Sequence, residues 1–168
     1  AVGTDALVAN TTASYNTAVG FEALGDTTTG EYNAGFGARA LSENTTASHG
    51  TAFGYNALRV NTGAENTAVG SNSAVTNTTG IKNVSVGAWS LRYNTTGDNN
   101  TAAGYQALNA NTTADNNTAF GYNTLQANTT ASNNTAVGSN ALLLNTTGHS
   151  NVAIGMQALD ANTTGHYN

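Results

Sequence analysis

The chain has 168 residues, of which 39% are apolar and only 8% are charged, and its formal net charge is −5. The chain has four Lys and Arg residues and nine Asp and Glu residues. It therefore has too few basic residues, and too many acidic ones, for a nucleic-acid-binding surface. No apolar run approaches the roughly 20 residues of a membrane helix, the absence of cysteine excludes disulfides and thiolate chemistry, and the apolar fraction argues against solvated disorder.

A glycine recurs along the whole chain at intervals of 17 residues, with a single interval of 16 residues between Gly54 and Gly70. The repeat has the consensus N-T-A-V-G-Y-N-A-L-x-A-N-T-T-(G/A)-x-N. Because such periods indicate stacked repeats, we predict one repeat domain of ten coils over residues 1–168. The ten glycines are Gly3, Gly20, Gly37, Gly54, Gly70, Gly87, Gly104, Gly121, Gly138 and Gly155.

The segment around each glycine has the two-residue alternation of a strand. In residues 17–21, Thr17, Val19 and Phe21 are expected to point one way, and Ala18 and Gly20 the other. The Asn-Thr-Thr-Gly segment then supplies turn chemistry. We predict about two short strands and two turns in each coil. Helices are disfavoured, because 17 residues cannot hold two helices and a glycine in each copy costs about 1 kcal/mol against alanine.

Two columns of the repeat are apolar and are predicted to form the core. The residue before the glycine is apolar in every copy, and the fourth residue after it is leucine in every copy except one. The first column is Val2, Val19, Phe36, Phe53, Val69, Val86, Ala103, Phe120, Val137 and Ile154. The second is Leu7, Leu24, Leu41, Leu58, Ala74, Leu91, Leu108, Leu125, Leu142 and Leu159. All charged residues fall in other columns.

Two further columns are almost entirely asparagine, one beginning at Asn10 and one at Asn16. Stacked coils place identical side chains above one another, and stacked asparagines form amide ladders. We therefore predict two asparagine ladders along the stack, which at about 4.8 Å per coil would be about 48 Å long.

The residue two before each glycine is always very small. On an alternating strand it points away from the Val/Phe column, so we expect it outside the core and in contact with another chain. The alternative is a narrow coil interior that admits only alanine. The candidate inter-chain contacts are Ala18, Gly35, Ala52, Ala68, Ala102, Ala119, Ala136 and Ala153.

The two ends of the chain suggest polymerisation. Joining Asn168 to Ala1 would give Asn-Ala-Val-Gly, one residue short of the consensus, and no capping segment is recognisable. Because bare solenoid ends template further pairing, we expect a head-to-tail polymer. Excision from a longer array would give the same sequence.

The segments Asn83–Gly87 and Asn151–Gly155 resemble the V-A-I-G strands in the head domains of trimeric autotransporter adhesins. The longer unit Asn100–Leu108 is similar to the N-T-A-x-G-Y-Q-A-L…N-T-T-G arrays of bacterial and phage tail-fibre-type proteins. The resemblance covers the whole chain. It implies a left-handed parallel β-roll, often trimeric, in an extracellular fibre that binds surfaces.

The fold class expected is therefore all-β, a β-solenoid or parallel β-roll of ten coils. The leading functional hypothesis is a non-enzymatic structural protein that self-assembles into an extracellular filament. The alternative is an adhesive or receptor-binding segment of a trimeric tail fibre or surface adhesin, located on a cell or virion. Expected partners are other copies of the chain, glycans or a receptor. We expect no catalytic residues, metal or cofactor, because carboxylates are scattered singly and His49, His149 and His166 lie in predicted surface turns.

Glycosylation is left open by the twelve Asn-x-Ser/Thr triplets that the repeat generates. If the Asn-Thr-Thr corner faces outward, its asparagine or threonine side chains could carry a ladder of glycans. The candidates are Asn10, Asn44, Asn77, Asn94, Asn111, Asn128, Asn145, Asn162, Thr12, Thr46, Thr113 and Thr130.

Two further surfaces are considered. Ice-binding solenoids use Thr-x-Thr, whereas Thr112 and Thr113 are adjacent, so an ice-binding face is a weak alternative. Phe21, Tyr55, Tyr105 and Tyr122 could form a sugar-binding stripe, although smaller residues interrupt it. Trp89 is the only tryptophan and the best single candidate for a local contact.

Overall fold

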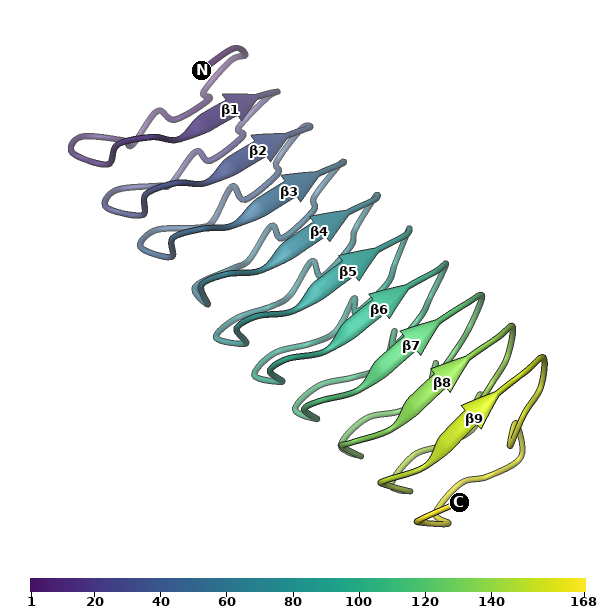
Figure 1. Cartoon of the computed structure of the whole chain (residues 1–168). Coiled ribbons are helices and arrows are strands. Elements are labelled where there is room, and N and C mark those ends of the chain that lie inside the picture. Colours follow the sequence, from purple (N-terminus) through teal and green to yellow (C-terminus); the bar gives the residue numbers. More distant parts are fainter.

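The computed structural model describes residues 1–168 as an all-β solenoid, in which nine short strands stack in sequence order into one parallel sheet (Figure 1). An isolated parallel bridge between Val2 and Val19 extends the same ladder by one coil at the N-terminus. The strands are β1 (Thr17–Val19), β2 (Ala34–Phe36), β3 (Thr51–Phe53), β4 (Thr67–Val69), β5 (Val84–Val86), β6 (Thr101–Ala103), β7 (Thr118–Phe120), β8 (Thr135–Val137) and β9 (Val152–Ile154). The predicted β-solenoid of 17-residue coils is confirmed. No helix is present that could cross a membrane.

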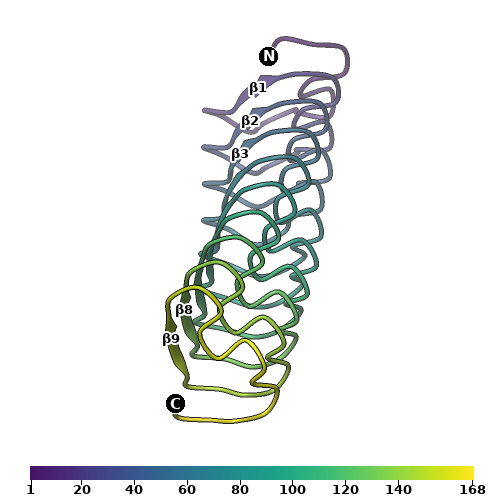
Figure 2. The ribbon, with the colours of Figure 1, turned by 90° about the vertical axis from the view of Figure 1, so that its right-hand side faces the viewer.

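The strands stack in a constant register. Each strand residue pairs with the residue 17 positions later, as in Ala102↔Ala119. The exception is the pairing of β3 with β4, where Thr51 pairs with Thr67. The missing residue therefore lies outside the sheet, in the Asn-Thr-Thr corner of the Gly54 coil. In the view turned by 90°, the coils wind one below another from the N-terminus at the top to the C-terminus at the bottom (Figure 2).

A coil contains at most one strand, of three residues, and not the two that were predicted. The leucine segment is a turn instead, because its backbone enters the left-handed region twice, as at Gln106 (φ 55°) and Leu108 (φ 50°). A leucine in this conformation costs about 1–2 kcal/mol. Leu108 is fully buried, which returns about 1.5–3 kcal/mol, and its N–H donates to Thr124 O of the following coil at 3.0 Å.

The core is formed by the leucine column and by the column of small residues, so the predicted orientation of the strand is wrong. Leu58, Leu91 and Leu108 are fully buried, as expected. The column before the glycine points outward: Phe53 is 44% exposed and Phe120 is 60% exposed, whereas Ala52 and Ala119 beside them are 0% exposed. The central residue of every strand is buried.

The interior is narrow, which explains why the inward strand residue must be small. A methyl group added at Gly35 would lie 3.2 Å from Ala40 O and 3.4 Å from Leu24 Cγ, across the coil. These positions pack against their own chain and are closed to a second one, so the prediction of an inter-chain contact is wrong and the narrow-interior alternative holds. The residues concerned are Ala18, Gly35, Ala52, Ala68, Ala102, Ala119, Ala136 and Ala153.

The glycine column lets adjacent coils approach each other closely. Gly104 has φ +140°, and a Cβ atom there would lie 2.2 Å from Gly121 O of the next coil. Both the dihedral angle and the contact exclude a side chain. The repeating glycine is therefore a requirement of the stacking distance.

The corrected orientation predicts opposite outcomes for one substitution at two adjacent positions. Ala102→Val overpacks the interior and should lower the free energy of unfolding by about 1–3 kcal/mol. Ala103→Val adds the same two methyl groups to the outer face, where valine is common in this column, and should change it by no more than about 0.5 kcal/mol. Urea unfolding of both variants measures the difference. Equal effects, or a larger loss for Ala103→Val, would contradict this orientation.

Candidate functional surfaces

One predicted asparagine ladder runs through the interior at the Asn-Thr-Thr corner. Asn111 Nδ2 donates to Asn94 Oδ1 of the preceding coil at 2.8 Å and to Ala114 O of its own corner at 3.1 Å. Asn128 Nδ2 donates in turn to Asn111 Oδ1 at 3.2 Å. The amide of each asparagine thus joins its own turn to the coil before it. The ladder is continuous from Asn61 to Asn162.

The second ladder lies at the entrance to the strands and uses both atoms of the amide. Asn100 N–H donates to Asn83 Oδ1 at 2.9 Å, and Asn83 Nδ2 donates to Gly97 O at 2.8 Å. Both side chains are buried. Since buried polar groups are costly unless paired, the two ladders explain why asparagine fills these columns. Both predicted ladders are confirmed, the first of them from Asn61 onward, since Asn44 bonds only within its own corner and Thr27 takes the place of an asparagine.

Both ladders are interrupted between the Gly37 coil and the Gly54 coil. Asn61 Nδ2 donates to Gly63 O at 2.8 Å and makes no bond to Asn44 of the preceding coil. Gly50 replaces asparagine in the second ladder, so no side-chain oxygen is available there for Asn66 N–H. The strands remain paired at this junction, where Thr51 N–H donates to Asn66 O at 2.9 Å. This junction carries fewer bonds than its neighbours.

The ladder contradicts the prediction that the corner asparagines are glycan acceptors. Their side-chain nitrogens donate hydrogen bonds inside the coil and cannot react with a sugar donor while the coil is folded. Six of these candidates are buried and the two terminal ones are half-buried: Asn44, Asn77, Asn94, Asn111, Asn128 and Asn145, then Asn10 and Asn162. The exposed Asn-x-Thr triplets begin instead at Asn99, Asn116 and Asn133. That these asparagines are exposed becomes clear only once the ladders show which asparagines are buried.

The two threonines of the corner differ in what their hydroxyl groups do. The first bonds to the next coil: Thr95 Oγ1 donates to Thr112 O at 2.9 Å, and Thr112 Oγ1 donates to Thr129 O at 3.1 Å. The second threonine is exposed. All four threonine candidates, which are Thr12, Thr46, Thr113 and Thr130, belong to this exposed column.

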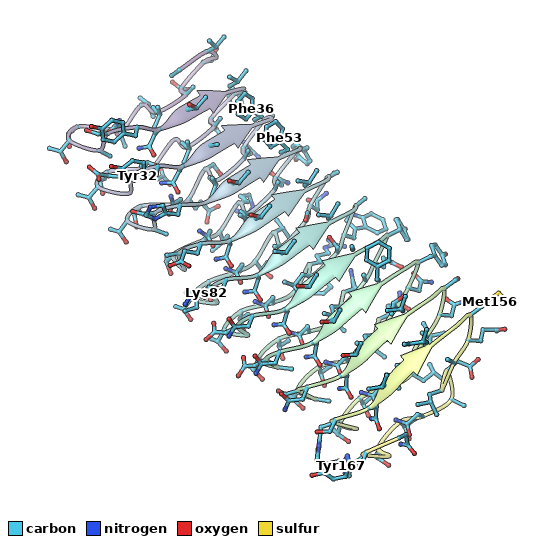
Figure 3. The ribbon with its side chains drawn as sticks, viewed as in Figure 1. Tyr32, Phe36, Phe53, Lys82, Met156 and Tyr167 are labelled. Carbon is cyan, nitrogen blue, oxygen red and sulfur yellow. The ribbon has the colours of Figure 1, made fainter.

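The outer face of the sheet carries a column of apolar side chains. Phe36 and Phe53 stack with ring centroids 4.4 Å apart and lie along one margin of the sheet (Figure 3). Beside this column, Tyr105 and Tyr122 stack at 5.6 Å, and Tyr105 contacts Trp89 at 5.5 Å. The aromatic residues after the glycine are therefore exposed but form only a short stack. The Trp89 ring also lies 5.5 Å from the Arg92 guanidinium.

Charged side chains gather in a groove over the N-terminal coils. Arg39 Nε donates to Glu22 Oε2 at 2.7 Å, and Arg59 pairs with Glu43. The hydrogen bond that Arg39 donates to the Glu22 carboxylate, and then the negative charge of that carboxylate, raise the pKa of Arg39. No group of three or more His, Cys, Asp or Glu side chains is placed to hold a metal ion. The groove is lined by Asp5, Val8, Glu22, Gly25, Asp26, Arg39, Ser42, Glu43 and Arg59.

The opposite corner from the apolar column carries a mixed stack of side chains. Tyr15, Tyr32 and His49 stack at 4.8 and 5.2 Å, and Tyr32, Lys82 and Tyr167 mark this margin in Figure 3. His149 and His166 stack at 4.1 Å near the C-terminus. His49 and His166 are exposed, as predicted, and His149 is half-buried.

No protein-family model, curated protein or solved structure matches this chain.

The buried ladder predicts a large effect from deleting one amide. Asn111→Ala leaves Asn94 Oδ1 without its donor and removes one of the two donors to Ala114 O, where Asn100 Nδ2 remains. It should lower the free energy of unfolding by about 1–3 kcal/mol. Thr113→Ala, two residues away on the surface, should change it by no more than about 0.5 kcal/mol. Thermal or urea unfolding of unglycosylated protein compares the two variants. A neutral Asn111→Ala would show that the ladder contributes no stability.

Proposed function

We propose that this β-solenoid is a non-enzymatic structural protein, the subunit of a self-assembling extracellular filament. The observation that carries the proposal is the constant coil-to-coil register. One and the same contact joins each pair of neighbouring coils inside the chain, so a coil of one copy can stack on a coil of another copy through that contact. Such a contact between copies is heterologous and builds an open filament.

The backbone supports this continuation. Within the chain, Leu142 N–H donates to Ala158 O at 3.0 Å and Gly155 N–H donates to Val137 O at 2.8 Å. A second copy stacked on the last coil would repeat both bonds. Leu159 N–H would donate to the copy's Ala6 O, and the copy's Gly3 N–H would donate to Ile154 O.

The side-chain ladders support it as well. Asn162 Oδ1 accepts from its own Gly165 N–H at 3.1 Å and lies where Asn10 of a stacked copy would extend the corner ladder. A third ladder runs beside it: Asp115 N–H donates to Ser132 Oγ at 3.0 Å, and His149 N–H donates to His166 Nδ1 at 3.1 Å. Ser14 of a stacked copy would accept from His166 N–H in the same way.

A trimeric adhesive or receptor-binding segment of a tail fibre or surface adhesin is the second candidate. The exposed apolar column of the outer face favours it, since Phe53, Phe120 and Ile154 would be covered by packing three sheets side by side. Lateral packing and end-to-end stacking use different surfaces of the coil. An ice- or glycan-binding face is a weaker candidate still. The aromatic column is interrupted by smaller residues, and the Thr112 hydroxyl donates a hydrogen bond to the following coil.

The filament is tested by blocking one end while leaving the coil intact. Val2 N–H donates to Ala18 O of the coil after it, so the equivalent Ile154 N–H of the last coil points to a stacked copy. Ile154→Pro removes that donor and places its ring in the junction, and proline is tolerated at a strand edge. The variant should melt like the wild type by circular dichroism and form no filaments by electron microscopy.

Ile154→Val keeps the N–H group and is the matched control, which should assemble like the wild type. Electron cryo-microscopy of native material should show continuous filaments with an axial repeat of about 48 Å, from ten coils at about 4.8 Å each. Discrete rods with threefold symmetry would overturn the filament and support the trimeric segment. Filaments formed equally well by Ile154→Pro would overturn the proposed junction.

A further inference from the structure

One exposed position of the repeat is threonine in nine of the ten coils, although no contact inside the chain requires a threonine there. It is the second threonine of each Asn-Thr-Thr corner, and all its members are exposed. The only coil without it is the Gly54 coil, where Thr62 is followed directly by Gly63. We call these residues the corner threonines: Thr12, Thr29, Thr46, Thr79, Thr96, Thr113, Thr130, Thr147 and Thr164.

Packing and hydrogen bonding explain the neighbouring columns but not this one. The preceding threonine donates its hydroxyl to the next coil in six coils, as Thr78 does to Thr95 O at 2.7 Å. Among the corner threonines only Thr12 makes such a bond, at 3.4 Å. The role of the others in the fold is a backbone one: Thr96 N–H, for example, donates to Thr112 O at 3.1 Å. That bond does not need a threonine side chain.

Other exposed columns of the same corner are free to vary. Three residues after the corner threonine, five of the coils carry an exposed side chain of varied type: Tyr15, Tyr32, His49, Lys82 and Asn99. Charged, aromatic and amide side chains are thus accepted there. The uniform column beside this varied one presents a row of exposed hydroxyl groups along one corner of the solenoid, and all of them except that of Thr12 donate no hydrogen bond within the chain.

We propose that the corner threonines are sites of O-glycosylation. Each Oγ1 would attack the anomeric carbon of a phosphate-activated sugar, forming the O–C1 bond as the C1–O bond to phosphate breaks. The hydroxyl proton passes to a base of the transferase and the phosphate leaves with the bonding electrons, so no oxidant or reductant is needed. A neutral sugar suits closely spaced positions, where a row of phosphate groups would repel one another.

The proposal is independent of filament formation, because it concerns a corner that single chains already present. The modified chain would carry a line of sugars down one corner, away from the apolar column of the sheet. The coil that lacks the threonine would interrupt this line once. Glycan attachment at the corner asparagines is excluded by their buried hydrogen bonds, and the exposed Asn99, Asn116 and Asn133 offer an alternative acceptor set that the test separates.

Mass spectrometry of the native chain tests the proposal on one peptide. Cleavage before Asp98 and Asp115 releases residues 98–114, which hold Thr113 as the predicted site and Thr112, Thr101 and Asn99 as internal controls. Electron-transfer fragmentation should place hexose or N-acetylhexosamine mass on Thr113 alone. Sugar on Thr112 or Asn99 instead, phosphate on Thr113, or an unmodified peptide would each overturn it.

A variant made in the producing cells gives a second, independent readout. Thr113→Val removes one hydroxyl while keeping the shape of the side chain, and should lower the intact mass by one glycan beyond the mass of the substitution. Thr112→Val is the matched control and should leave the number of glycans unchanged. Equal glycan numbers in wild type and Thr113→Val would overturn the assignment.

Discussion

The hydrogen-bonded contact between one coil and the next is the constraint on which this molecule depends. No coil has a core of its own beyond a leucine and one or two small residues, so its stability comes from its neighbours. The stacking distance forces a glycine into every coil, since a Cβ at Gly104 would meet Gly121 O. The same distance places identical side chains of neighbouring coils in contact. Asparagine can be buried there because its amide forms hydrogen bonds with the asparagine amide of the next coil.

The leucine turn shows how such a fold tolerates local strain. The residue of the leucine column, which is Leu24 or Leu41 for example and Ala74 in one coil, adopts positive φ in every coil, as does the residue two before it. L residues avoid this region. The strain is outweighed because the leucine side chain fills the interior and the leucine N–H donates a hydrogen bond to the following coil. A three-residue strand, one leucine turn and an Asn-Thr-Thr corner make up the coil.

Periodicity alone was sufficient to predict the solenoid, the coil length and the two asparagine ladders, since a 17-residue repeat of identical columns has few other solutions. The side of the strand that faces inward was not predictable in the same way. Val19 and Ala18 alternate, and the larger side chain was assigned to the core on hydrophobicity. The structure reverses this because the leucine turn lies close behind the strand and leaves room for a methyl group only. The twofold use of φ > 0 around Leu108 was equally hidden, because neither residue type signals it.

The junction between the Gly37 and Gly54 coils has a mechanical consequence. A solenoid pulled along its axis carries the load in series through every coil-to-coil contact, so it yields first at the weakest one. With Gly50 in place of an asparagine and with Asn61 bonded only within its own corner, that contact lacks both amide cross-links. Under tension the coils would separate at this contact first, into a group of three coils and a group of seven coils that the backbone still joins. The contact that opens first under tension therefore lies about a third of the way along the solenoid.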